Sequence, residues 1–377
     1  MKKFLALLLA LVMSLSLVAC GGGDDTAADG GADAEDGGNA ETAAYQVAMI
    51  TDYGDITDQS FNQTTYEACQ EFCDAEGLQF EYYKPAGDST AERVAMVDAA
   101  VADGYNVIVM PGYAFAETIK ETAELYPDVT FIALDVAQGD LGEDYTVPSN
   151  VYCAVYQEEL CGYMAGYAAV KLGYTHLGVL GGMAVPAVQR FGYGFVQGAD
   201  AAAKELNEKV EMNYSWQYGS NFSSSPELQT MANGWYQSGT EVIFACGGSM
   251  FQSIVAAASA NDKFVIGVDV DQSGESEYVV TSAMKGLADA VQWAVAKVYD
   301  GTFDTIGGQQ TSLGVADNAV ELPTGADSWR FETFTVEKYE SLYQQMVDGT
   351  LVVDDDYTVM DNAETATNWS NVNVNII

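Results

Sequence analysis

Short apolar runs recur along the chain at intervals that leave room for a helix between them. The runs are rich in β-branched residues and are bounded by polar residues or glycine, which predicts β-strands. They cover 47–51, 80–84, 107–110, 130–135, 177–180, 242–246, 264–269 and 278–282. Apolar residues at helical spacing predict helices over 58–76, 89–103, 115–126 and 186–206. This alternation predicts an α/β fold with parallel sheets.

A ligand site is expected among the residues that follow these strands. In an open parallel sheet the ligand lies beyond the carboxyl ends of the strands, where loops lead into helices. The corresponding positions are 51–62, 111–115, 135–139, 181–184, 247–250, 269–272 and 283–286. Asp58 or Ser60 is expected to cap the helix that follows the first of these loops.

The N-terminus has the pattern of a secretory signal. Lys2 and Lys3 precede an apolar run that ends in Leu17-Val18-Ala19-Cys20. A small residue followed by cysteine at the cut is typical of a bacterial lipoprotein, so we interpret 1–19 as the signal peptide and Cys20 as the lipidated residue. The apolar run is too short for a spanning helix. We therefore expect an extracytoplasmic protein that lipid anchors to the cell membrane.

The chain after Cys20 divides into a tether and a larger body. Residues 20–44 are acidic and contain no large apolar side chain, so they cannot bury enough surface to fold and are interpreted as a flexible tether. The remaining residues are too many for one small core and predict two lobes. We assign residues 45–150 and 275–310 to lobe 1. Residues 151–274 and 311–377 are assigned to lobe 2.

Charge and residue inventory exclude several classes of function. The 55 Asp+Glu residues outnumber the 14 Lys+Arg residues, giving a formal net charge of -41. This balance argues against nucleic acid as a partner, because such binding needs basic patches. The single histidine, His176, and the unmatched Cys69 and Cys73 predict no metal site. No nucleophile elbow or phosphate loop is present, so we expect neither catalytic residues nor a cofactor.

Two groups of residues suit the two halves of a glycosylated heterocycle. Phe61 can stack on a flat ring while Asp52 or Asn62 contacts its polar edge; alternatively, Phe61 belongs to the core. Asp269 and Lys285 lie at the ends of two strands and suit the vicinal hydroxyls of a sugar; alternatively, they form an ion pair that only holds the lobes together.

Glycines mark two further segments. Gly247 lies in a binding loop, where glycine either lets backbone amides approach a ligand or permits a tight turn. Residues 192–198 nearly match a dinucleotide fingerprint, but the last glycine is one position late and no strand leads into the segment. We interpret these glycines as small residues on a packed helix. Arg190, in the same helix, is expected to form an ion pair.

Four segments together resemble the basic membrane protein family of lipoproteins, also called PnrA-like: 51–62, 181–195, 267–272 and 282–285. The resemblance spans nearly all of the body. It implies a type I periplasmic-binding-protein fold, in which two Rossmann-like lobes joined by three hinge crossings close over a nucleoside for an ABC importer.

The resemblance also implies roles for individual residues. Phe61 and a second aromatic residue would sandwich the base, with Asp52 and Asn62 at its edge. Phe222 occupies the position of the second aromatic residue, but Ser-Ser-Ser-Pro226 replaces the usual downstream Asp-Pro, and Trp216 or Tyr218 could substitute. The ribose would be held by Asp135, Asp269 and Lys285.

We therefore expect a lipid-anchored, monomeric substrate-binding protein, without enzymatic activity, that captures a nucleoside for an ABC importer permease. A purine nucleoside is favoured. Two alternatives stay open. Carboxylates alone could cleave an N-glycosidic bond, which would make the protein a nucleoside hydrolase; the same fold could also serve as a surface sensor or adhesin.

Overall fold

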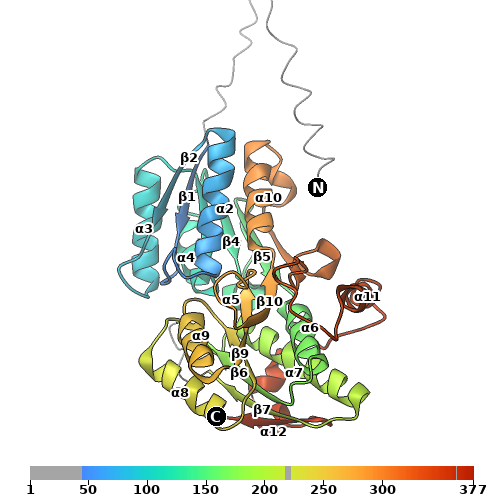
Figure 1. The fold of residues 1–377 in the computed structure, drawn as a ribbon. Helices are drawn as coiled ribbons and strands as arrows, with labels where there is room; N and C mark the ends of the chain where they lie inside the picture. The colour runs from blue at the N-terminus through green and yellow to red at the C-terminus, as the bar shows by residue number, and fades with distance from the viewer. Residues whose placement is uncertain (1–44, 217–221, 362) are drawn as a thin grey trace, which may run out of the picture. The chain divides into compact units, whose positions relative to one another are not determined.

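The first of two parallel sheets lies near the N-terminus of the folded body (Figure 1). The computed structural model describes residues 45–216, 222–361 and 363–377. The first sheet has the order β11-β5-β4-β3-β1-β2, and all its strand pairs are parallel. Its strands are β1 (Gln46–Ile50), β2 (Gln79–Tyr83), β3 (Val107–Pro111), β4 (Thr130–Leu134), β5 (Val151–Tyr156) and β11 (Gln309–Leu313).

The second sheet has the order β12-β10-β9-β8-β6-β7-β13. Its pairs are parallel except for β10 with β12, which is antiparallel. Its strands are β6 (His176–Gly181), β7 (Val210–Ser215), β8 (Val242–Cys246), β9 (Phe264–Asp269), β10 (Val279–Lys285), β12 (Val320–Glu321) and β13 (Val372–Ile376). The predicted α/β class with parallel sheets is thus confirmed.

Burial accounts for some of the strands that the sequence pattern misses, namely β11 and β13, but not for the fully buried β5 (Val151–Tyr156). Every residue of β3 and β8 is buried, as expected for central parallel strands that are covered on both faces. The edge strand β13 buries only alternate residues, and β11 has no fully buried residue. Each predicted strand corresponds to an observed one, whereas β5, β7, β11, β12 and β13 were not predicted.

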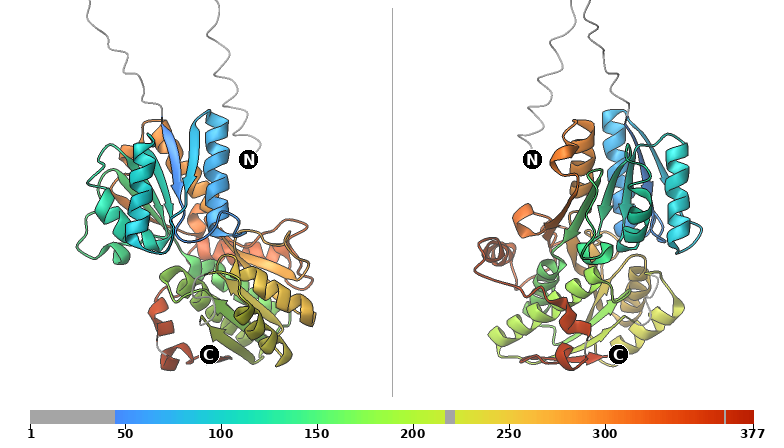
Figure 2. Two further views of the ribbon diagram at one scale, coloured as in Figure 1. Left: turned by 90° about the vertical axis from the view of Figure 1, so that its left-hand side faces the viewer. Right: turned by 180° about the vertical axis from the view of Figure 1, so that it is seen from behind.

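Pairs of helices cover both faces of each sheet (Figures 1 and 2). On the first sheet, α2 packs with α10 on one face, and α3 packs with α4 on the other; on the second, α6 packs with α7, and α8 with α9. These helices are α2 (Phe61–Glu76), α3 (Thr90–Ala102), α4 (Ala116–Thr122), α6 (Glu158–Lys171), α7 (Pro186–Leu206), α8 (Pro226–Gln237), α9 (Met250–Asn261) and α10 (Leu287–Tyr299). Shorter or peripheral elements are α5 (Gln138–Leu141), α11 (Val336–Val347), α12 (Ala363–Ala366), η1 (Tyr113–Phe115), η2 (Phe303–Thr305), η3 (Val315–Asp317) and η4 (Tyr357–Asp361).

Glycines bring α6 and α7 into close contact. A Cβ atom at Gly166 would lie 2.0 Å from the carbonyl oxygen of Phe195, and one at Gly198 would lie 1.9 Å from that of Tyr163. No real side chain tolerates such distances, so the two helix backbones approach closely only because both helices carry glycine at the contact. The glycines of 192–198 therefore pack a helix, as predicted from the sequence.

The chain passes between the two sheets three times. It leaves β5 at Gln157, β10 at Gly286 and β11 at Gly314. The amide of Gln157 donates to the carbonyl of Leu313 at 2.9 Å, so the first and third crossings lie side by side. The amide of Gly286 donates to the carbonyl of Ala319 at 2.8 Å. These are the three crossings that the resemblance implies.

The lobe boundaries expected from the sequence are wrong at these crossings. β5 belongs to the first sheet although 151–274 was assigned to lobe 2, and β10 belongs to the second sheet although 275–310 was assigned to lobe 1. The end of β11 was likewise placed in lobe 2. Two boundaries were set before the last strand and the third within it, because sheet membership depends on long-range pairing that local pattern does not contain.

The described residues include five cysteines, and none of them forms a disulfide. The cysteines of the described residues are free and buried: Cys69, Cys73, Cys153, Cys161 and Cys246. Within 45–216, 222–361 and 363–377, no group of three or more potential metal ligands is gathered, and no helix has the length and apolar character needed to cross a membrane. The segments predicted to be the signal peptide and the tether, with Cys20, lie outside the described residues.

Candidate ligand-binding site

A cavity of about 300 Å³ lies where strands of both sheets end. Its walls come from the ends of, and the segments after, β1, β2, β3 and β4 of the first sheet and β6, β7, β8, β9 and β10 of the second. This is the position expected for a ligand in parallel α/β sheets. The lining includes every binding residue expected from the sequence: Asp52, Phe61, Asn62, Asp135, Phe222, Gly247, Asp269 and Lys285.

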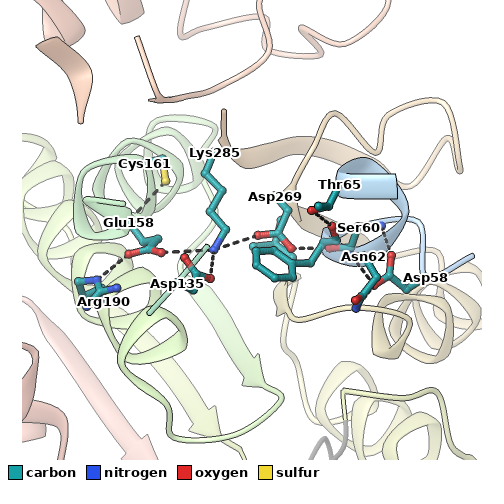
Figure 3. Close-up of polar contacts among 12 residues, drawn as sticks. Asp58, Ser60, Asn62, Thr65, Asp135, Glu158, Cys161, Arg190, Asp269 and Lys285 are labelled. Atoms are coloured by element: carbon teal, nitrogen blue, oxygen red, sulfur yellow. Dashed lines mark hydrogen bonds and ion pairs between the residues drawn. The ribbon is translucent and has the colours of Figure 1, made fainter. Parts of the chain in front are cut away.

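Lys285 is the centre of a buried charged cluster (Figure 3). It ends β10, and its side chain is 2% exposed. The Nζ atom lies 2.6 Å from Oδ2 of Asp135, 3.3 Å from Oε1 of Glu158 and 3.8 Å from Oδ1 of Asp269. Although burial opposes ionisation, these carboxylates raise the pKa of Lys285 above its usual value. Lys285 is therefore a permanent cation that joins carboxylates from both sheets.

Aromatic rings enclose the same ammonium group. The Nζ atom of Lys285 lies 4.7 Å from the ring centroid of Phe61, 5.2 Å from that of Tyr156 and 5.7 Å from that of Phe191. Cation–π contact at these distances favours the charged amine and excludes water from it. Phe61 thus lines the cavity and also covers the charged cluster. Its position is therefore compatible with both roles considered for it, contact with a ligand and packing against other side chains.

Asp135 and Asp269 both occupy left-handed backbone conformations at strand ends. Their φ angles are 58° and 67°, a region that costs non-glycine residues energy and is enriched at functional sites. Burial raises the pKa of Asp135 to about 6, against the opposing charge of Lys285, and burial also raises the pKa of Asp269. Oδ1 of Asp135 is buried and has no hydrogen-bond partner among the described residues. An acceptor therefore remains available beside the cavity.

Glu158 and Arg190 extend the charged cluster. Glu158 is the first residue of α6, and its side chain is fully buried. Its Oε2 atom accepts a 2.6 Å hydrogen bond from Nε of Arg190, so Arg190 forms the ion pair expected from the sequence. Burial disfavours the charge of Glu158, but Arg190 and Lys285 outweigh burial and lower its pKa. Arg190 also lines the cavity.

The loop between β1 and α2 supplies polar groups of a different kind. Oδ1 of Asp52 accepts the backbone amides of Tyr53 and Gly54 at 2.6 and 2.7 Å, and burial raises the pKa of Asp52. Asp58 caps α2, as expected, by accepting the amides of Ser60, Asn62 and Gln63. Oδ1 of Asn62 is buried without a hydrogen-bond partner in the described part of the chain. The loop therefore presents an amide oxygen that a ligand could use.

Phe222 is held at the cavity by glycines. Its φ is 56°, and a Cβ atom at Gly247 would lie 2.4 Å from Cδ1 of its ring. The Phe222 ring stacks with Tyr53 from the other lobe, with centroids 6.3 Å apart and planes inclined by 24°. Because Gly247 has no side chain, it leaves space for the ring of Phe222.

The other aromatic candidates differ in position. Trp216 packs edge-on against Tyr214 at 5.4 Å and is absent from the cavity lining in the described structure. Tyr218 lies outside the described residues. Tyr113, which follows β3, does line the cavity. Among the candidates that the structure describes, Phe222 is therefore the second aromatic residue at the site.

A short segment before α2 connects the two lobes directly. The side chain of Gln59 donates to Glu275 and accepts from Gln252 at 3.2 Å, and its carbonyl accepts from Gln272 at 2.9 Å. The hydroxyl of Ser60 donates to Oδ2 of Asp269 (Figure 3). The first lobe thus contacts one of the cavity carboxylates of the second.

Comparison with known families decides what kind of protein carries this site. The sequence profile of the family described as ABC transporter substrate-binding protein PnrA-like (Bmp) matches residues 45–356. The chain belongs to this family. It is therefore the substrate-binding protein of an ABC transporter, and it acts outside the cytoplasm, where such proteins present their substrate to the transporter.

Individual relatives agree with membership of the PnrA-like family. The CD4+ T-cell-stimulating antigen of Listeria innocua is 27% identical over an alignment covering 93% of this chain and 98% of that protein. The ABC transporter nucleoside-binding protein BmpA of Lactococcus lactis is 27% identical, with 74% and 81% covered. A solute-binding protein of an ABC transporter from Aeropyrum pernix shares the fold, with a TM-score of 0.69 at 22% identity and 84% and 95% of the chains covered. The fold is the type I periplasmic-binding fold.

Sequence reasoning missed two prominent residues of this PnrA-like site. Tyr53 lies within the loop that was singled out, but no role was predicted for it. Glu158 was missed because no strand was predicted over β5, which directly precedes it. The continuous apolar pattern of β5 carries the missing signal: extending the strand-end rule to this run places Glu158 two residues beyond a strand.

Proposed function

We propose that this PnrA-like protein binds a nucleoside, with a purine favoured, and presents it to its ABC importer while lipid on Cys20 holds it at the membrane. The observation that carries the proposal is the pairing of two kinds of surface in one cavity. One surface is aromatic with amide and carboxylate groups, and the other consists of two carboxylates beside one ammonium.

The aromatic surface suits a flat nitrogen heterocycle. Phe61, Phe222 and Tyr53 offer ring faces for stacking. The unpartnered Oδ1 of Asn62 can accept a hydrogen bond from a ring or exocyclic N–H, and Asp52 supplies a second acceptor. Acceptors of this kind favour the donor-rich edge of a purine.

The charged surface suits a neutral sugar with adjacent hydroxyls. Asp135 from the first sheet and Asp269 from the second both lie near Nζ of Lys285. Each carboxylate can accept one O–H, while the ammonium donates to a hydroxyl oxygen. A ribose presents two such hydroxyls on neighbouring carbons, and a 2′-deoxyribose presents one fewer.

The proposed ligand also explains why two lobes are needed. Asp135 and Asn62 belong to the first lobe, and Asp269 and Lys285 to the second. A ligand that contacts both sets stabilises the conformation in which the lobes are close together, and so shifts the population toward the form that a transporter can recognise. A relative named as a nucleoside-binding protein, BmpA of Lactococcus lactis, supports the same ligand class.

Isothermal titration tests the ligand. The purified protein, unfolded and refolded to remove carried-over ligand, is titrated with purine and pyrimidine nucleosides, free bases and ribose, and the mixtures are analysed for products. The proposal predicts one-to-one binding of a nucleoside, tighter than its base or ribose, without turnover. Absence of binding across the panel contradicts it, and cleavage to base and ribose identifies a hydrolase instead.

Lipid attachment has its own test. Cells expressing the full chain are grown with a radiolabelled fatty acid, and the protein is isolated. Label is expected on the native protein and is expected to be absent from Cys20→Ser, which should also be released from the membrane. Equal labelling of both proteins rules out Cys20 as the attachment site.

A further inference from the structure

The side chain of Glu158 contacts two cations of the cavity but does not itself line the cavity in the described structure. Its Oε1 atom lies 3.3 Å from Nζ of Lys285, and its Oε2 atom lies 2.6 Å from Nε of Arg190. Lys285 and Arg190 both line the cavity. Glu158 can therefore affect a ligand only through these two side chains.

The location of Glu158 makes this arrangement rigid. It follows Gln157, where the chain first crosses between the sheets, and it begins α6, whose close contact with α7 fixes it relative to Arg190. A carboxylate in the first turn of a helix is stabilised by the unpaired backbone amides there. Arg190 is held from its other side by Tyr357, whose ring centroid lies 5.6 Å from Cζ.

We propose that Glu158 is a positioning residue: it fixes the Lys285 ammonium and the Arg190 guanidinium, and thereby sets the affinity of the sugar end of the cavity. Without Glu158, only Asp135 and Asp269 would contact the Lys285 ammonium. The ammonium would then move closer to one of these two carboxylates, which would be less available to a ligand hydroxyl. This inference rests on the proposed function, because it assigns the charged end to the sugar.

The chemistry of the two oxygens provides a discriminating substitution. A carboxylate accepts hydrogen bonds at both ends, whereas a glutamine amide accepts at one end and donates at the other. In Glu158→Gln, the side chain keeps its shape, but its NH₂ group must face either the ammonium of Lys285 or the guanidinium of Arg190. One of the two cations therefore loses its partner.

The neighbouring Glu159 offers a matched control. It is also a buried glutamate in the first turn of α6, at 4% exposure. Its Oε2 atom has no hydrogen-bond partner among the described residues, and it forms no ion pair there within 4.0 Å. Glu159→Gln thus makes the same chemical change in the same turn without changing the ion pairs of Lys285.

The test compares binding of a nucleoside with binding of its free base by isothermal titration. Glu158→Gln is expected to weaken nucleoside binding roughly 10- to 100-fold, the range seen when outer partners of a binding group are removed. Binding of the free base should change less than about threefold, because the aromatic surface is untouched. Glu159→Gln should change neither. Equal losses for nucleoside and base, or equal effects of both substitutions, would show a merely structural role and overturn the inference.

A ligand-free measurement keeps the two proposals separable. In protein labelled with ¹⁵N-lysine, a buried ammonium held by carboxylates exchanges its protons slowly and gives a detectable NH₃⁺ signal. The signal of Lys285, identified by its loss in Lys285→Met, is expected to persist in Glu159→Gln and to broaden or shift in Glu158→Gln. If the native protein binds no nucleoside, the proposed function fails whatever this spectrum shows. If binding is normal and the Lys285 signal is unchanged in Glu158→Gln, only the inference fails.

Discussion

The charged end and the aromatic end of the cavity are built in different ways. At the charged end, Lys285, Asp269 and Glu158 occupy the last residue of a strand or the first residue of a helix, and ion pairs hold them in place. At the aromatic end, Tyr53 and Phe222 belong to loops and are placed by ring contacts and by glycines. The comparison indicates that one end is fixed by charge and the other by shape, so substitutions should affect them in separable ways.

The largest effect is expected from Lys285→Met. The substitution leaves Asp135, Asp269 and Glu158 without their common cation, and breaking a buried ionic network typically costs about 3–5 kcal/mol of stability. Nucleoside binding should weaken roughly 100-fold or more, while binding of the free base persists in the fraction that folds. Denaturant unfolding and isothermal titration measure the two quantities.

Lys84→Met is the control for this substitution. Lys84 also lines the cavity, but its ion pair with Asp55 is largely exposed, with side-chain exposures of 43% and 57%. Its loss should therefore change stability by less than about 1 kcal/mol. Similar losses of affinity in both variants would mean that burial in the cluster is not what makes Lys285 important.

The next effect is expected at the aromatic end, in Phe222→Ala. Loss of a stacking ring should cost about 1–3 kcal/mol per base, or roughly 5- to 150-fold in affinity. The loss should be the same for nucleoside and free base, in contrast to Lys285→Met. Titration of both ligands checks the pattern, with Trp216→Ala as an aromatic substitution away from the cavity lining. A loss confined to the nucleoside would assign Phe222 to the sugar end.

The protonation of Asp135 should make ligand binding at the charged end sensitive to pH. The pKa of Asp135 is raised to about 6, chiefly by burial, so ligand hydroxyls lose their ionised acceptor as the pH falls below that value. Nucleoside affinity is expected to drop about tenfold between pH 7 and pH 5. Affinity for the free base should depend only weakly on the protonation of Asp135. Titrations at several pH values test this difference.

The same group makes an opposite contribution to the stability of the ligand-free protein. Because the folded pKa of Asp135 exceeds its ordinary value of 3.8, the native state holds the proton more tightly than the unfolded state between these values. The stabilising contribution of Asp135 is complete below about pH 4 and is lost as the pH rises through about 6. The difference in unfolding free energy between the native protein and Asp135→Asn, measured against pH, should show this slope. A flat difference contradicts the assignment.

The smallest effect is expected from Gly247→Ala. The added Cβ atom would lie 2.4 Å from the ring of Phe222, at a φ of 144°, so the ring must move and binding should weaken by roughly three- to tenfold for nucleoside and base alike. Gly239→Ala is the control, because its φ is 116° but nothing lies within 4 Å of the new atom. It should lose stability without losing affinity.

Local pattern predicted most of the strands that are buried on both sides, with β5 as the exception. The central strands β3, β4, β8 and β9 have continuous apolar runs, and the rule that ligands lie beyond strand ends then indicates Asp135 and Asp269. β7, which pairs with β6 and β13, and the edge strand β13 were missed because exposed polar residues interrupt their apolar pattern. The role of Phe222 came from resemblance, since nothing in its local sequence distinguishes a cavity ring from a packed one.

The order of strands could not be predicted, for a different reason. β5 and β10 look like any other buried strand, and only their partners decide which lobe they join. Because β5 was not predicted as a strand, Glu158, which follows it, was not recognised as a site residue. Errors in topology and in the site therefore have a common origin at the crossings.

The three crossings also determine how the protein can be made. The first sheet is completed only when β11 pairs with β5, and β11 is synthesised after β6 to β10 of the second sheet. A chain that has emerged only as far as β9 therefore leaves one edge of β5 unpaired, a state prone to misassociation. Neither lobe corresponds to a continuous piece of sequence that could be expressed alone. Both sheets can therefore be completed only after the last strands, β11 to β13, have been synthesised.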